Sequence, residues 1–307
     1  MRYIIQNQSN TQPKISIILL DWKVRESYHT LEYLNRQRCN RELYEIIWVE
    51  FYDYTAEPLL KLVSKYEKLD LPSPVDQWIV LENPDERCYH KHVMYNTGIL
   101  HAKGDIIVIM DSDAIVKTDF ISFILEEFTK TPDIVLHLEE IRNFDNKFYP
   151  FSYPVLEEVL GEGIAMPYEI KISNKTEVNL NKSEISLKQD PGLMHVYNYG
   201  SCFCAGRRNL INIGGADEHV DYMGHICGPY EMTLRLINAG FTDRLHPSYF
   251  LYHVYHPNQG GDNNYCGPNN GKGMSTTAMA VLEENRVMPL QENPEIRKLR
   301  LRDQKEH

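Results

Sequence analysis

Two aspartates separated by one serine, Asp111 and Asp113, directly follow a run of apolar residues at positions 106–110. The run has the length and composition of a strand that is buried on both faces. In an extended chain, residues two apart point the same way, so both carboxylates can face one ligand. Two carboxylates this close repel each other unless a cation or a proton lies between them. Because carboxylate oxygens are hard ligands, the pair predicts a Mg²⁺ or Mn²⁺ site, where the ion also binds phosphate oxygens.

The chain before this pair alternates between strand and helix patterns. Strand-like runs occupy 15–20, 45–53, 78–83 and 106–110, and helical patterns occupy 27–37, 58–69 and about 86–102. This alternation predicts an α/β domain with a parallel sheet and helices on both faces. Open parallel sheets bind ligands at the carboxyl ends of their strands, and the two aspartates lie at such an end. A further strand is expected at 134–144.

The segment from Tyr95 to Val116 resembles DxD-containing family 2 glycosyltransferases of the type that builds bacterial polysaccharides. In that family an Asn-x-Gly helix and an Ala-x-Gly-Asp turn lead to the metal-binding strand. The matching positions are Asn96, Gly98, Ala102, Gly104, Asp105, Asp111 and Asp113. The resemblance implies the GT-A fold, with a mostly parallel central sheet, helices on both faces and a C-terminal extension. It assigns 1–256 to the glycosyltransferase domain, with a nucleotide-sugar-binding half at about 13–116 and an acceptor-side half at 117–256, and 257–307 to the extension.

The resemblance also implies which residues contact the donor. Glu50 takes the place of the aspartate that contacts the nucleotide base, and Asp53 lies close by in the sequence. Asn96 and Asp111 are expected to contact the nucleotide sugar as well. The Gly- and Asn-rich stretch after residue 257 contains Lys272, which we expect to reach the donor phosphates from a loop that folds over them. A structureless linker is the alternative interpretation of this stretch.

The metal shell implied by the resemblance begins with Asp111 and Asp113. In such enzymes a histidine at the end of a later strand completes it, and His253 fits this position. His256 is the competing candidate, because residues three apart on an extended chain need not point the same way. A partly buried polar role is the alternative for both histidines.

The segment 228–241 resembles the acceptor-side helix of the family, where an acidic pair usually precedes the helix. Here Gly228 and Pro229 replace that pair, and Glu231 remains as the candidate base that takes the proton from the acceptor hydroxyl. The alternative is a first-turn glutamate that only complements the helix dipole. The other candidate acids are Asp217, Glu218 and Asp221. Aromatic residues gather between 144 and 199, where they are expected to pack in the core or to serve as platforms for sugar rings.

Composition limits the partners and the compartment. The net charge of −11 makes nucleic acid an unfavourable partner. The six cysteines form no CxxC pair, which favours reduced thiols, and the N-terminus has no apolar signal region. No run approaches 18 apolar residues, so we expect no membrane span and a cytoplasmic protein. The basic tail at 296–305 has two interpretations, a peripheral contact with anionic lipid at the inner face of the membrane or a solvated helix end.

The expected reaction is the transfer of one sugar, with inversion, from a nucleoside diphosphate donor to a hydroxyl of a glycan or glycolipid. A sugar nucleotidyltransferase also combines an α/β sheet with carboxylate-bound Mg²⁺. That class carries a Gly-rich basic loop after the first strand, whereas this chain reads DWKVRES there. A non-catalytic glycan-binding protein on the same fold would keep the aromatic residues and could lack the base.

Overall fold

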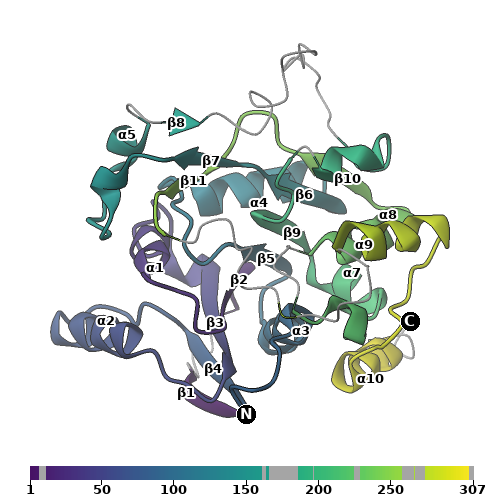
Figure 1. Cartoon of the computed structure of the whole chain (residues 1–307), viewed down its shortest axis with the longest axis horizontal. Helices are drawn as coiled ribbons and strands as arrows, with labels where there is room; N and C mark the ends of the chain where they lie inside the picture. The colour runs from purple at the N-terminus through teal and green to yellow at the C-terminus, as the bar shows by residue number, and fades with distance from the viewer. Residues whose placement is uncertain are drawn as a thin grey trace.

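A computed structural model describes residues 1–6, 12–160, 164–165, 186–195, 197–224, 229–257, 266 and 274–303. Its centre is an eight-stranded sheet in the order β1-β4-β3-β2-β5-β9-β6-β10 (Figure 1). The strands are β1 (Arg2–Gln6), β2 (Ile15–Asp21), β3 (Tyr44–Tyr52), β4 (Gln77–Asn83), β5 (Ile106–Met110), β6 (Ile134–Leu138), β9 (Cys202–Gly206) and β10 (Thr242–Leu245). Only β1 and β9 pair antiparallel with their neighbours in this sheet. The expected mostly parallel sheet is therefore confirmed.

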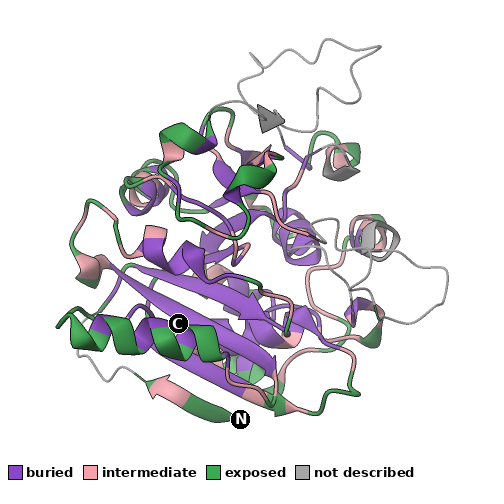
Figure 2. Ribbon diagram, turned by 60° about the vertical axis from the view of Figure 1, so that its left-hand side comes forward, coloured by how far each residue is buried: buried purple, intermediate pink, exposed green. Residues whose placement is uncertain are grey.

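Helices cover both faces of the central sheet. One face packs against α1 (His29–Leu34), α2 (Glu57–Lys68) and α4 (Phe120–Lys130). The other packs against α3 (Lys91–His101), α7 (Arg207–Asn212), α8 (Tyr230–Asn238) and α10 (Pro294–Asp303). Alternation along each strand makes this possible, since Ile17 in β2 faces the first group and Ile18 faces the second. Figure 2 shows the central strands buried while the outer faces of the helices are exposed.

Two glycines of the motif before β5 allow close packing on β2. A Cβ at Gly98 would lie 2.6 Å from the side chain of Ile18, and a Cβ at Gly104 would lie 2.7 Å from the backbone of Ile15. Because neither glycine has a side chain, α3 lies directly on β2 and the turn into β5 passes close to the beginning of β2. The carboxyl end of β5, which leads to Asp111, is thereby held next to that of β2.

A second sheet has the order β11-β7-β8, with β7 (Glu140–Asn143), β8 (Ile164–Ala165) and β11 (Leu251–Val254). Only Glu139 separates β6 from β7. The single strand expected at 134–144 is therefore wrong, because the chain leaves the central sheet at Glu139 and joins the second one. A bridge between Ile115 and Tyr252 connects the turn after β5 to β11.

The two helices in the described range 274–303 pack on the rest of the chain. Helix α9 (Met274–Glu283) lies on α8, and α10 lies on α3 and α7, as the yellow helices of Figure 1 show. Ile296 of α10 is 0% exposed and belongs to the core of one sheet face. The remaining short elements are α5 (Leu156–Val159) and 3-10 turns at Arg41–Leu43, Asn146–Phe148, Pro191–His195 and Val220–Tyr222.

A disulfide joins Cys88, just before α3, to Cys266, and the two Cα atoms are 5.8 Å apart. The expectation of reduced thiols is wrong for this pair, because residues 178 positions apart in the sequence meet in the fold. Spacing along the chain gave no sign of this contact. No helix within the described ranges combines the length and the apolar character needed to cross a bilayer.

Candidate functional site

The chain turns at Asp111, immediately after β5. The N–H of Asp111 donates to the carbonyl of Ser201 at 2.9 Å, and the N–H of Ala114 donates to the carbonyl of Asp111 at 3.3 Å. The hydroxyl of Ser112 bonds the N–H and the carbonyl of Leu20 in β2, at 2.9 and 2.8 Å. The residues thus form a turn anchored to β2 rather than the extended stretch expected from the sequence. As a result, the two carboxylates have different neighbours.

Asp113 faces two histidines. Its Oδ2 is 3.7 Å from Nε2 of His253 and 3.4 Å from Nε2 of His256, and the two Nε2 atoms are 3.2 Å apart. His253 lies in β11, which ends at Val254, and His256 follows the strand. The sequence made the histidines competitors for one position, but the structure brings both to Asp113. They converge because the chain is no longer a strand when it reaches His256.

These three side chains form a group that could hold a divalent cation. Their ligand atoms all lie within 4.8 Å of one another, and the described part of the chain contains no second group of this kind. One carboxylate oxygen and two imidazole nitrogens are suitable metal ligands, and they leave coordination positions for phosphate oxygens. Asp111 lies outside the group. The geometry therefore favours Asp113 with both histidines over the expected pair of aspartates.

Arg25 brings a positive charge to the same carboxylate. Its Nη1 forms an ion pair with Oδ2 of Asp113, and the two side chains are only 12% and 14% exposed. The loop that carries Arg25 is held by Asp21, whose Oδ1 accepts the N–H groups of Val24 and Arg25 at 3.0 and 3.3 Å. The sequence reasoning gave Arg25 no role. The available signal was a basic residue four positions beyond the end of a central strand.

The carboxyl groups of this site have very different proton affinities. Burial, with the charges of Glu140 and Asp113, raises the pKa of Asp111 to about 7. Burial would raise the pKa of Asp113 as well, but Arg25 and the two histidines hold that pKa well below its usual range. Asp113 is therefore the charged carboxylate at neutral pH. Burial lowers the pKa of His29 to about 4, and its Nε2 lies 2.7 Å from the carbonyl of Asp113, so a neutral imidazole supports the turn.

The two expected contacts of the nucleotide base lie in different environments. Glu50 is 1% exposed at the end of β3, where it pairs in register with Asp21 of β2. Burial and the charge of Asp21 raise the pKa of Glu50 to about 8. Asp53 is 64% exposed and forms a surface ion pair with Arg2 at 2.8 Å. Asp53 thus faces the edge strand β1, and only Glu50 lies beside Asp21 near the carboxyl ends of β2 and β3.

The side chain of Asn96 bonds Ala216 and Glu218 in the turn before α8. Its Oδ1 accepts the N–H of Ala216 at 2.7 Å, and its Nδ2 donates to the carbonyl of Ala216 and to Oε1 of Glu218, both at 2.9 Å. The side chain is 0% exposed. Both ends of the amide are therefore engaged in joining α3 to the turn before α8. The expectation that Asn96 contacts the nucleotide sugar does not fit this geometry.

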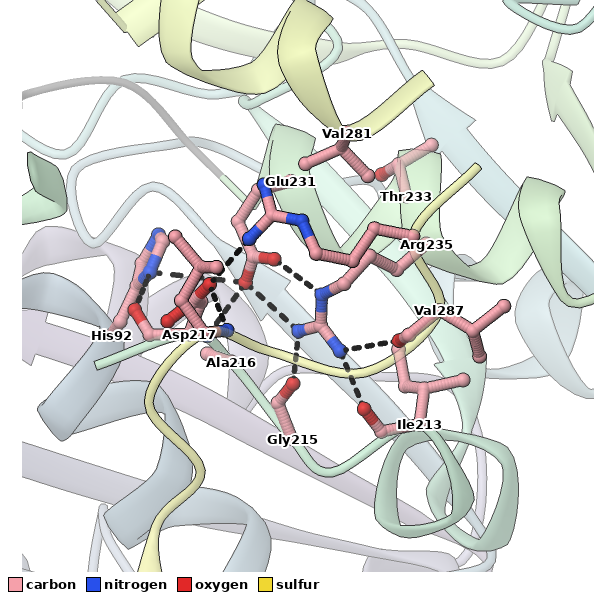
Figure 3. A network of polar contacts seen from close by, with 12 residues as sticks. His92, Ile213, Gly215, Ala216, Asp217, Glu231, Thr233, Arg235, Val281 and Val287 are labelled. Atoms are coloured by element: carbon pink, nitrogen blue, oxygen red, sulfur yellow. Dashed lines mark hydrogen bonds and ion pairs between the residues drawn. The ribbon is translucent and has the colours of Figure 1, made fainter. Parts of the chain in front are cut away.

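Glu231 lies in a closed network at the beginning of α8 (Figure 3). Its Oε2 accepts from Nε of Arg235 at 2.6 Å. Its Oε1 accepts from Nη2 of Arg235 at 3.0 Å and from the N–H of Asp217 at 2.8 Å. Arg235 donates further to the carbonyls of Ile213, Gly215 and Val287. Burial alone would raise the pKa of Glu231, but Arg235 and these bonds lower it below the ordinary value.

This arrangement argues against Glu231 as the base. A base must reach the acceptor hydroxyl with a free oxygen lone pair. Both oxygens of Glu231 are engaged, the side chain is 0% exposed, and a lowered pKa makes the carboxylate a weaker proton acceptor. The spacing of Glu231 and Arg235, four apart on one helix, was the sequence signal for an ion pair.

The other candidate acids are engaged as well. Oδ1 of Asp217 accepts the N–H of Gln291 at 2.9 Å, and its Oδ2 accepts that of Leu290 at 2.8 Å. Oε1 of Glu218 accepts from Asn96 and from Asn293. Asp221 lies 3.6 Å from Nδ1 of His219. Gly228 and Lys272 lie outside the described residues.

Comparisons with known proteins agree with this fold. A family model described as glycosyl transferase family 2 matches residues 28–211. Crystal structures of S. aureus TarS align with TM-scores of 0.50 (residues 1–349; 13% identity, 78% of this chain and 60% of that chain) and 0.51 (14%, 80% and 37%). The complex of TarS 1–349 with UDP-GlcNAc aligns with a TM-score of 0.54 at 12% identity, over 94% of this chain and 70% of that chain.

At such identities the likeness shows the fold alone, and the expected GT-A α/β fold is confirmed. This chain spans 60% and 37% of the first two TarS chains. A search of curated proteins finds no match.

Proposed function

The chain belongs to glycosyl transferase family 2, and on this basis we propose that it is a glycosyltransferase, which transfers one sugar from a nucleoside diphosphate donor to a hydroxyl of a glycan or glycolipid. We include inversion at the anomeric carbon and dependence on Mn²⁺ or Mg²⁺ in the proposal. The observation that carries it is the convergence of Asp113, His253 and His256 at the carboxyl end of the central strands. The TarS complex with UDP-GlcNAc supports a nucleotide sugar as the class of donor.

The chain supplies positive charge where the donor diphosphate would lie. Arg25 pairs with Asp113, and Lys91 is only 7% exposed, with its Nζ 4.5 Å from the ring centroid of Trp22. The charge of Lys91 also acts on Asp111. A cation bound by Asp113 and the two histidines would neutralise charge on the departing nucleoside diphosphate. Two imidazoles in the shell favour Mn²⁺ over Mg²⁺.

Aromatic rings lie next to the histidines, where Tyr149 is exposed and Phe151 and Tyr255 are half-buried, and they suit a sugar acceptor. Phe151 stacks on His29 with ring centroids 4.3 Å apart, and its ring is 6.1 Å from that of His256. Tyr149 is 39% exposed and lies edge-on to Phe151 and Tyr255. We place the acceptor sugar on these rings, because the apolar face of a sugar packs well on aromatic surface. Of the aromatic residues expected to be core or platform, Phe148, Tyr197 and Tyr199 are buried and serve as core.

Incubation with a panel of nucleotide sugars and Mn²⁺ tests the proposal. Release of nucleoside diphosphate is the expected result, and NMR of the transferred sugar reports inversion. With pyrophosphate added, formation of nucleoside triphosphate and sugar 1-phosphate would favour a nucleotidyltransferase, and no turnover with retained glycan binding would favour a binding protein.

Asp113→Asn provides the site-specific arm of this test. We expect it to abolish Mn²⁺-dependent donor binding in calorimetry while the protein stays folded. Asp105→Asn is the matched control, because Asp105 precedes the same strand at its other end and is 72% exposed. Unchanged affinity in Asp113→Asn would place the metal and donor site elsewhere.

Peripheral membrane contact through the C-terminal helix is part of the same proposal. Arg297 and Arg302 of α10 are 65% and 67% exposed, and their ion pairs are long, at 3.9 and 4.0 Å, so these two charges are available to anionic lipid. Lys298 is held by Glu295 at 2.6 Å, and Arg300 is held by Glu292, with Nε and Oε1 2.7 Å apart. A membrane-bound enzyme would meet lipid-linked acceptors at that surface.

A further inference from the structure

Two buried polar atoms face each other behind the histidine of β11. Oε1 of Glu140 and Nδ1 of His253 are 3.9 Å apart, and the two side chains are 1% and 8% exposed. Neither atom has a hydrogen-bond partner among the described residues. Buried polar atoms rarely stay unpaired, because each one loses its bonds to water on folding. Their separation exceeds hydrogen-bond length by about 1 Å, which small side-chain rotations can close.

The pairing of the two strands explains why these residues meet. In the parallel pair β7·β11, Glu140 lies opposite Leu251 and Arg142 lies opposite His253. Residues two apart in a strand share a face, so Glu140 and His253 lie diagonally on the same side of the sheet. The other carboxylate oxygen of Glu140 has two polar neighbours. Its Oε2 is 3.4 Å from Nδ2 of Asn198 and 3.6 Å from Nη2 of Arg142.

We propose that Glu140 is a positioning residue that accepts the Nδ1–H of His253 and so presents the Nε2 lone pair of His253 toward Asp113. This inference rests on the proposed metal-dependent function and deepens it. A histidine that binds a metal through one nitrogen commonly donates its other N–H to a carboxylate, which fixes the tautomer and orientation of the ring. The unpaired Nδ1 of His253 and the unpaired Oε1 of Glu140 supply the two halves of that arrangement.

The chain passes from the central sheet to the second sheet at Glu139, and this passage places Glu140 beside His253. Glu139, the residue between β6 and β7, turns its carboxylate to the N–H of Asn198 at 3.0 Å. Glu140 is the first residue of the second sheet and points toward β11 instead. The two adjacent glutamates therefore have separate tasks, and Glu139 offers a matched control.

Mn²⁺ affinity, measured by electron paramagnetic resonance on the full chain, tests the proposal. We expect Glu140→Leu to raise the Kd for Mn²⁺ by roughly 10–100-fold. Glu140→Gln should raise it less, because the amide oxygen still accepts the Nδ1–H. Glu139→Gln should leave the Kd within about twofold of wild type. Equal Kd values for wild type and Glu140→Leu would overturn the inference, and so would losses in Glu140→Gln as large as in Glu140→Leu, because Glu140 would then act through its charge.

A spectroscopic signature separates positioning from a general structural effect. In the Co²⁺-loaded protein, the Nδ1–H of a bound histidine gives an exchangeable, paramagnetically shifted proton signal. We expect wild type and Glu140→Gln to retain the His253 signal and Glu140→Leu, or Glu140→Ala if the leucine variant does not fold, to lose it through exchange with water. An unaltered signal in these variants would refute the role of Glu140. If wild type itself bound no Mn²⁺, or Asp113→Asn bound it equally well, the proposed function would fail instead.

Discussion

Glu231→Gln distinguishes a structural carboxylate from a catalytic one, because the two roles predict opposite results. The substitution removes the negative charge from an ion pair whose two side chains are both 0% exposed. Breaking a buried pair by removing one partner costs about 3–5 kcal/mol of unfolding free energy, because the remaining charge is left uncompensated. Arg235 would keep its bonds to three carbonyls, and the new amide could still accept the N–H of Asp217. We therefore expect the lower end, about 3 kcal/mol.

The assay combines thermal unfolding with sugar transfer at a temperature where the variant is folded. A loss of about 3 kcal/mol should lower the melting temperature by roughly 5 °C in a chain of 307 residues. Transfer at 20 °C should stay within a few fold of wild type, since neither oxygen of Glu231 reaches an acceptor. Glu32→Gln is the matched control. Glu32 is also buried, but its partners Arg36 and Lys65 are 60% and 56% exposed, so a much smaller change is expected.

A particular outcome would refute this reasoning. If Glu231→Gln kept the wild-type melting temperature and lost transfer by roughly 10²–10⁴-fold, the carboxylate would be the base after all. Such a result would mean that the network around Arg235 opens when substrates bind. If both quantities fell together, a second measurement of transfer after stabilisation by bound donor would separate them.

Two further predictions concern pH and lipid. The pKa of Glu50 is raised to about 8 from 4.5 by burial and by Asp21, so its stabilising contribution is full below pH 4.5 and is lost as the pH rises to about 8. Glu50→Gln should therefore be more stable than wild type at pH 8, by at most about 4–5 kcal/mol, and similar at pH 4.5 in urea unfolding; parallel curves would contradict the raised pKa. For the lipid contact, Arg297→Glu with Arg302→Glu should reduce sedimentation with anionic vesicles, whereas Lys61→Glu on α2 should not. Truncation before α10 is a poor alternative because Ile296 is buried. Equal sedimentation of wild type, the double variant and Lys61→Glu would contradict the proposed lipid contact.

Four strands of the central sheet could be predicted, β2, β3, β4 and β5, because they are apolar runs separated by helical patterns. The edge strands β1 and β10 could not, since RYIIQ and TDRL contain no run of this kind. Glycines such as Gly98 and Gly104 then allow the close contacts that set β2 next to β5. The exchange between sheets at Glu139 could not be predicted in this way. Residues 134–144 have one continuous strand-like pattern, and only contacts with distant segments decide which sheet each half joins. The same limitation hid the pairing of Cys88 with Cys266.

The site shows a related limit. Asp113 and His253 were expected as a strand-end carboxylate and a late strand-end histidine, and the structure places Oδ2 and Nε2 of these residues 3.7 Å apart. Arg25 was not, because a basic residue in a loop has many ordinary partners and only the fold brings its guanidinium to Asp113. Asn96 was assigned a donor contact for the opposite reason, since a buried amide with structural partners has the same appearance in a sequence as one that binds a ligand.

Asn96 and Glu231 have a common structural task, although the sequence suggested two separate functional ones. Asn96 of α3 bonds the backbone of Ala216, Glu231 of α8 bonds the N–H of Asp217, and Arg235 bonds the carbonyls of Ile213 and Gly215. Side chains of α3 and of α8 therefore both hold the turn between α7 and α8. Because α3 leads directly into β5 and Asp111, this clamp fixes α8 relative to the strand end. Variants that loosen this clamp should disturb the donor and acceptor sides together. Residues that do not contact a substrate can therefore lie within a segment that resembles a catalytic motif.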